Sequence, residues 1–111
     1  MSGEMALGPG AEFDAIRLMI EHWGARAVAL GDDAAELKVA RGDTLVVSVD
    51  TAVEGIHFRR EWLSPKEIAY RAVTAALSDI AAMAAKPLGV LTAITLPQRW
   101  RASLDDLASG I

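Results

Sequence analysis

Four short segments with acidic or hydroxyl side chains follow one another along the chain. They are Gly31-Asp32-Asp33, Ser48-Val49-Asp50-Thr51, Gly55-Ile56-His57-Phe58, and the run Leu77-Ser78-Asp79-Ile80-Ala81-Ala82-Met83. Oxygen ligands of this kind suit Mg²⁺, which prefers octahedral coordination by oxygen and commonly shares it with substrate phosphates. The chemistry and order of these segments therefore predict part of an enzyme that uses a magnesium-bound nucleotide.

Asp79 is the most informative of these residues. On a helix, its neighbours three and four positions away would be Ala75, Ala76, Ala82 and Met83, none of which can form an ion pair with it. A carboxylate buried among such side chains is costly unless a cation or hydrogen-bond donors compensate it, which favours a metal ligand. The alternatives are a solvent-facing aspartate on an amphipathic helix and an aspartate that caps another segment.

The other three segments each have an ordinary structural interpretation as well. Asp32-Asp33 after a glycine is typical of a turn, because aspartate hydrogen-bonds its own backbone there. Asp50 follows an apolar run, where a charged residue is either a solvated strand end or a ligand at the mouth of a sheet. His57 could donate to a phosphate oxygen, although a single loop histidine is more often structural.

Two helices are expected to flank these segments. Ser64-Pro65-Lys66-Glu67 combines a serine cap, proline at the first helical position and glutamate at the third, so a helix should run from there to about Ala85. An earlier helix begins near Glu12 and ends at Gly24, because apolar residues lie three to four positions apart on one face. These residues are Phe13, Ile16, Ile20 and Trp23.

A third helix is expected at Ser103 to Ala108, with Ser103 as its cap and Asp106 at its third position. Strands are expected where β-prone apolar runs end at turn residues, with one turn at Arg41-Gly42-Asp43. The expected strands are Val28 to Leu30, Leu37 to Val39, Thr44 to Val49 and Leu88 to Leu96. Mixed helices and strands with few aromatic residues suit an α/β packing.

The 111 residues allow one domain at most, residues 11–111, after a flexible segment at residues 1–10. The net charge is −4 and the basic residues are scattered, which argues against a nucleic-acid partner. The sequence has no cysteine for a disulfide or thiolate site. It shows neither a signal peptide nor the roughly 20 apolar residues of a membrane span. We expect a cytoplasmic protein that does not bind membranes.

In sequence and spacing, the segments resemble the N-terminal part of thiamine-monophosphate kinases, members of the aminoimidazole ribonucleotide synthetase-like ATP-binding superfamily. The resemblance extends from about Gly10 to Trp100 and includes Gly-Asp-Asp, Ser-x-Asp-Thr-x-x-Glu-Gly-x-His-Phe and Leu-Ser-Asp-Ile-Ala-Ala-Met. It implies an α/β (α+β) fold, in which a mixed sheet flanked by helices contributes to a dimer β-barrel. A homodimer is therefore expected.

The resemblance also implies a reaction and a set of site residues. The reaction is the phosphorylation of thiamine phosphate to thiamine diphosphate, with ATP as the phosphate donor and Mg²⁺ as the cofactor. Asp33, Ser48, Asp50 and Asp79 match the positions that bind Mg²⁺ in that family, and His57 matches a position that contacts the substrate. No side chain is assigned as a catalytic acid, base or nucleophile, and none as a nucleotide ligand.

Some features differ from the family pattern. Ala84 replaces a glycine, a change expected to be mild or to favour the helix, because alanine is the better helix former. Val49 leaves only a backbone carbonyl where a hydroxyl is common. The chain ends at Ile111, before the family's next metal motif, Gly-Gly-Asp, and its C-terminal domain. We therefore expect an incomplete N-terminal portion that is inactive alone.

Three alternative functions remain open at this stage. One is a non-catalytic module that dimerises or binds a magnesium nucleotide without turnover. The others are ATPases of the same superfamily, similar to selenophosphate synthetases or to hydrogenase-maturation proteins. The run Ser-x-Asp-Thr-x-x-Glu-Gly-x-His-Phe favours the thiamine enzyme over these two ATPases.

Overall fold

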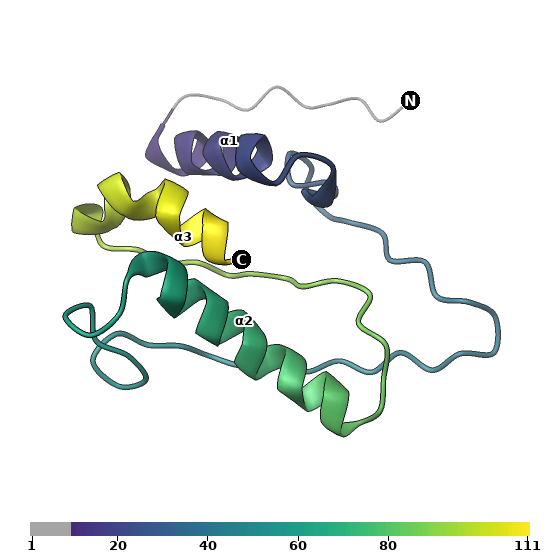
Figure 1. Cartoon of the computed structure of the whole chain (residues 1–111). Helices are drawn as coiled ribbons and strands as arrows, with labels where there is room; N and C mark the ends of the chain where they lie inside the picture. Colours follow the sequence, from purple (N-terminus) through teal and green to yellow (C-terminus); the bar gives the residue numbers. More distant parts are fainter. Residues whose placement is uncertain (1–9) are drawn as a thin grey trace. The chain divides into compact units, whose positions relative to one another are not determined.

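The structure is a computed structural model that describes residues 10–111. The predicted flexible segment at residues 1–10 lies outside this range except for Gly10. The chain forms two compact units, Met1–Glu36 and Leu37–Ile111. Figure 1 shows the helices in chain order, and the described helical elements are α1 (Ala11–Trp23), η1 (Gly24–Arg26), α2 (Pro65–Ala82), η2 (Gln98–Ser103) and α3 (Leu104–Gly110).

The first unit confirms the helix predicted from the apolar spacing. Helix α1 ends before Gly24, which has φ 55° and donates its N–H to the carbonyl of Ile20. The strand predicted at Val28 to Leu30 is wrong, because these residues form a turn in which Ala29 has φ 53°. Local hydrogen bonds account for this turn, since the N–H of Asp32 donates to the carbonyl of Ala29 at 3.0 Å.

The start of α2 confirms the predicted capping box. The Ser64 hydroxyl accepts from the N–H of Glu67 at 3.2 Å, and the Glu67 carboxylate accepts from the N–H of Ser64 at 2.8 Å. Pro65 occupies the first helical position, where its missing N–H costs nothing. The N–H of Ser64 and, to a lesser extent, its hydroxyl hydrogen-bond the Glu67 carboxylate, which stabilises the charged form and lowers the pKa of Glu67 from its ordinary value.

The end of α2 differs from the prediction. The helix ends at Ala82, before the expected Ala85, and Ala84 has φ 53°. Its N–H donates to Ala81 at 3.0 Å and the N–H of Ala85 donates to Ile80 at 3.1 Å, which is the hydrogen-bond pattern of a Schellman motif. The left-handed position favours glycine, so Ala84 does not favour the helix as the second part of the expectation had it.

The core of the second unit lies between α2 and the C-terminal helices. The buried residues of this core are Ile68, Ala69, Trp100 and Leu107. The partly buried side chains packed against them are Phe58, Leu63, Leu96 and Ile111. Helix α3 approaches α2 so closely that a Cβ at Gly110 would overlap the Lys66 carbonyl. The Ser103 side chain does not cap α3 as predicted. Asp106 instead accepts from the N–H of Lys66 at 3.3 Å, in the first turn of α2.

The predicted mixed sheet is not formed in the described residues. Segments 37–39, 44–49 and 88–96 have no assigned strand, and the bridge from Glu54 to Phe58 is isolated. The turn at Arg41-Gly42-Asp43 is confirmed, because the N–H of Asp43 donates to Ala40 at 3.0 Å. Strand propensity favours an extended backbone, but a ladder also needs a neighbouring strand in register. The described segments do not provide one, so neither the sheet nor the barrel is observed.

Candidate functional site

Two of the predicted magnesium ligands contact each other in the second unit. The Ser48 hydroxyl donates to Oδ2 of Asp79 at 2.8 Å, although 31 positions separate the two residues. Ser48 belongs to the segment that runs alongside α2, and Asp79 lies near the C-terminal end of that helix (Figure 1). Two oxygen donors from distant parts of the sequence therefore converge on one point.

The surroundings of Asp79 differ from those inferred from its helical neighbours. Its side chain is exposed, as in the solvent-facing alternative, so burial does not require a compensating cation. Within residues 10–111, no ion pair occupies its carboxylate. The adjacent Ser78 turns its hydroxyl back to the carbonyl of Ala75 at 2.6 Å. Asp79 consequently keeps lone pairs available for a ligand.

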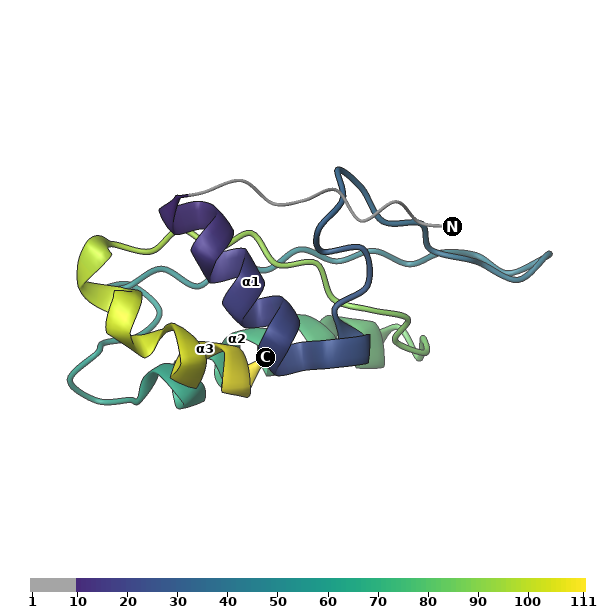
Figure 2. The ribbon, with the colours of Figure 1, turned by 90° about the horizontal axis from the view of Figure 1, so that it is seen from above.

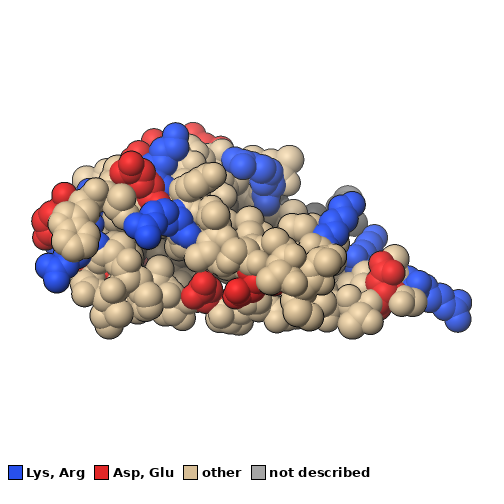
Figure 3. Space-filling view, turned by 60° about the horizontal axis from the view of Figure 1, so that its bottom comes forward, with Lys and Arg blue, Asp and Glu red and all other residues tan. Residues whose placement is uncertain are grey.

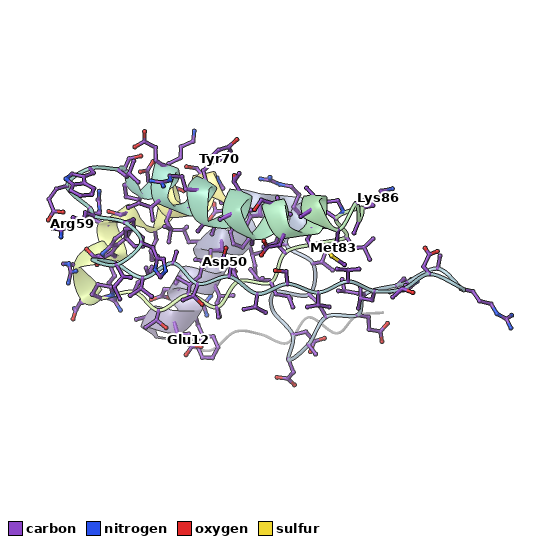
Figure 4. The ribbon with its side chains drawn as sticks, turned by 90° about the horizontal axis from the view of Figure 1, so that it is seen from below. Glu12, Asp50, Arg59, Tyr70, Met83 and Lys86 are labelled. Atoms are coloured by element: carbon purple, nitrogen blue, oxygen red, sulfur yellow. The ribbon has the colours of Figure 1, made fainter. Side chains whose placement is uncertain are left out.

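Asp50 lies two residues after Ser48 on the same extended segment. Successive side chains of an extended backbone alternate, so Ser48 and Asp50 share one face. Figure 4 shows Asp50 where this segment passes α2. One oxygen of Asp50 accepts from the N–H of Thr51 at 2.9 Å, which leaves the other oxygen available.

Asp33 belongs to the first unit. The carboxylate of its neighbour Asp32 accepts from the N–H of Asp33 at 2.8 Å, as expected for the turn interpretation of Asp32-Asp33. No group of three or more acidic or histidine side chains in the described part of the chain is arranged to hold a metal ion. The structure thus joins Ser48 to Asp79, but it does not form the complete set of four ligands.

His57 has a fixed orientation in its loop. Nδ1 of its ring accepts from the N–H of Val53 at 2.9 Å, and the N–H of His57 donates to the carbonyl of Val53 at 2.8 Å. A ring nitrogen that accepts a hydrogen bond carries no proton, so the proton of the neutral ring is on Nε2. Gly55 permits the tight turn through its φ of 84°. The loop therefore presents His57 as a donor through Nε2.

Two contacts that the sequence did not reveal hold the His57 loop against the rest of the second unit. Glu54 forms an ion pair of 2.7 Å with Arg99, which is 45 positions away. The Phe58 and Trp100 rings form a T-shaped pair in the core, with centroids 6.1 Å apart. Glu54 and Phe58 were within the recognised motif, but their partners become apparent only in three dimensions.

Basic and acidic side chains are both scattered over the face seen in Figure 3, most of which is formed by other residues. None of the helices in residues 10–111 has both the length and the apolar character needed to cross a membrane.

Residues 31–111 match the family described as AIR synthase related protein, N-terminal domain, and the chain belongs to this family. This membership agrees with the superfamily inferred from the motifs, although the mixed sheet and barrel are not seen.

The chain is also similar to proteins named thiamine-monophosphate kinase, which confirms the resemblance. It is 51% identical to the protein of Synechococcus elongatus over 73% of this chain and 25% of the relative. For the Bacillus subtilis protein the identity is 38%, over 83% of this chain and 29% of the relative. For the Escherichia coli protein the identity is 40%, over 71% of this chain and 25% of the relative. No solved structure matches the chain significantly.

The chain thus spans about a quarter of the length of these relatives. The activity of a whole relative is consequently a proposal for this chain.

Proposed function

We propose that this chain provides the Mg²⁺-binding N-terminal part of a thiamine-phosphate kinase, which transfers phosphate from ATP to thiamine phosphate. The similarity to kinases of that name supports the proposal. The observation that carries it is the contact between Ser48 and Asp79, which brings together two oxygen ligands from separate motifs.

The donor set fits a hard cation, since three carboxylates and one hydroxyl offer only oxygen ligands. We assign Mg²⁺ to Asp33, Ser48, Asp50 and Asp79. Mg²⁺ would neutralise charge between the donor and acceptor phosphates, the main requirement of phosphoryl transfer. Ser48 would orient the Asp79 carboxylate through its hydrogen bond. His57 would donate a hydrogen bond from its Nε2–H to the acceptor phosphate and align it for in-line attack.

The proposal includes a homodimer. It also includes a cytoplasmic location, where ATP is present as the phosphate donor. The segment at residues 44–49 directs Leu45, Val47 and Val49 outward, and the last two are 72% and 88% exposed. Apolar side chains on an unpaired extended segment are a common site of association, because both the side chains and the backbone groups need partners. A second copy of the chain is the partner that the resemblance implies.

The magnesium assignment can be tested by the effect of Mg²⁺ on the melting temperature of the chain. At ten times the dissociation constant, binding should stabilise the folded state by about 1.4 kcal/mol. Asp79→Asn should abolish this effect, whereas Asp43→Asn, in the turn at residues 40–43, should retain it. A melting temperature unaffected by Mg²⁺ in the unaltered chain would contradict the assignment.

The magnesium response alone does not separate a kinase from a non-catalytic module that binds a magnesium nucleotide. Thiamine phosphate separates them, because only the kinase requires a site for this acceptor. The kinase proposal therefore predicts that the native protein binds thiamine phosphate in the presence of Mg²⁺ and a non-hydrolysable ATP analogue. Binding of the analogue without the acceptor would favour the module.

A further inference from the structure

A pocket of about 350 Å³ lies beside the His57 loop and contains none of the four proposed magnesium ligands. Its volume is at the lower end of the range of small-ligand sites, roughly 300 to 1,000 Å³. The lining residues come from the loop before α2 and from η2, and most are charged: Glu54, Gly55, Arg59, Arg60, Glu61 and Arg99. Figure 4 labels Arg59 in that loop.

Each of the three arginines is held by a different contact. The Arg59 guanidinium stacks over the Trp62 ring at 5.2 Å, and that of Arg60 stacks over Trp100 at 5.0 Å. Arg60 also donates to the Ser103 hydroxyl at 3.2 Å. The third, Arg99, forms the ion pair with Glu54 described above. Restrained guanidinium groups lose less entropy when they bind a ligand than freely rotating ones.

The charges of the pocket are only partly compensated. Glu54 compensates Arg99, which leaves Arg59 and Arg60 with Glu61 as the remaining acidic residue of the lining. Neither Arg59 nor Arg60 forms an ion pair within the described residues. Arg60 is half-buried and links the loop to η2, so its role is mainly structural. Arg59 is exposed and retains free donors on its guanidinium.

We propose that this pocket binds a phosphate group, with Arg59 as its principal ligand. A guanidinium offers paired N–H donors whose geometry matches two phosphate oxygens, which gives bidentate binding. This site is separate from the magnesium site and does not require the kinase activity. The phosphate can come from free phosphate, from a phosphate monoester such as thiamine phosphate, or from ATP.

The proposal is tested with inorganic phosphate in EDTA, so that no Mg²⁺ contributes. Phosphate should raise the melting temperature of the chain above that in NaCl of equal ionic strength. Arg59→Gln should weaken phosphate binding at least tenfold. Arg59→Lys should weaken it less, because lysine keeps the positive charge and loses only the paired N–H donors of the guanidinium. Arg41→Gln, a control on the turn at residues 40–43, should bind as the unaltered chain does.

Two further measurements separate this proposal from the magnesium assignment. Asp79→Asn should leave the phosphate response in EDTA intact, even though it abolishes the Mg²⁺ response. Thiamine phosphate and ATP, tested in the same buffer, identify the source, since the natural ligand should bind more tightly than inorganic phosphate. No response to any of the three, or an unchanged response in Arg59→Gln, would overturn the proposal.

Discussion

At the scale of single residues, hydrogen bonding defines the chemistry of His57. Its Nδ1 accepts from Val53, so Nε2 is the nitrogen that can donate to a substrate oxygen. The sequence placed His57 near the acceptor phosphate only through the family resemblance. The preference for one nitrogen depends on a backbone N–H four positions earlier in a turn at Gly55, which the residue types do not specify.

Two substitutions test this role of His57. In His57→Asn, the amide oxygen can replace Nδ1 as the acceptor for Val53, but the Nε2 donor is lost. We expect the native protein to bind thiamine phosphate at least about tenfold more weakly, the cost of a hydrogen bond to a charged group. His57→Gln should bind more tightly than His57→Asn, because its amide nitrogen can approach the Nε2 position.

Nuclear magnetic resonance gives the matching control. Long-range correlations between ring protons and nitrogens should show the proton of the neutral ring on Nε2. A proton on Nδ1, or equal binding by the two variants, would contradict the assigned role.

At the scale of elements, the helices were largely predictable and the strands were not. Ser64, Pro65 and Glu67 define the start of α2 through contacts within four residues, which a sequence reveals directly. The segment at residues 44–49 has the predicted alternation, since Ser48 contacts α2 while Val47 and Val49 are exposed. A β-ladder, however, depends on a neighbour distant in sequence. Sequence pattern therefore predicted the extended segments but not their unpaired state.

The capping box makes the stability of α2 depend on pH. The pKa of Glu67 is lowered in the folded state, so its contribution is complete above the ordinary value of 4.5 and is lost as the pH falls through the lowered value. As the pH falls through the window around and below 4.5, the free energy of unfolding should therefore decrease less in Glu67→Gln than in the unaltered chain. Urea unfolding at several pH values measures this difference.

A second variant of the capping box provides a reference value. Ser64→Ala should lower the free energy of unfolding by about 1 kcal/mol at neutral pH, the usual effect of losing a serine cap. An identical acid dependence in Glu67→Gln and the unaltered chain would show that Glu67 does not contribute this pH effect.

The other end of α2 allows a stabilising substitution. Ala84 has φ 53°, a conformation that glycine adopts without steric cost. We expect Ala84→Gly to raise the free energy of unfolding by roughly 0.5–1 kcal/mol, since relief of the steric cost exceeds the added chain entropy. Ala81→Gly, inside the same helix, should lower it by about 1 kcal/mol. Urea unfolding measures both, and destabilisation by Ala84→Gly would contradict this interpretation.

At the level of the whole molecule, the exposed apolar side chains of residues 44–49 indicate a surface for association. We expect the chain to form a homodimer whose dissociation constant rises when Val47 and Val49 are both changed to aspartate. Placing charges in an apolar contact removes the burial that favours association. Sedimentation measurements at several concentrations should show this change. Tyr70→Asp, on the exposed face of α2, serves as the control and should leave the dimer unchanged.

A chain that remains monomeric at all concentrations, or a dimer insensitive to both valine changes, would contradict the dimer proposal. The sequence predicted the dimer through the family resemblance. The exposed side chains of residues 44–49 add a location for the contact, which the pattern alone did not provide.

We propose that this chain is part of a magnesium-dependent thiamine-phosphate kinase. The most direct measurement is the formation of thiamine diphosphate from ATP and thiamine phosphate by the native protein purified from its source cells. We expect product in the presence of Mg²⁺, and none after EDTA or with Asp79→Asn. Folded protein that binds Mg²⁺ and ATP but forms no thiamine diphosphate would contradict this proposal.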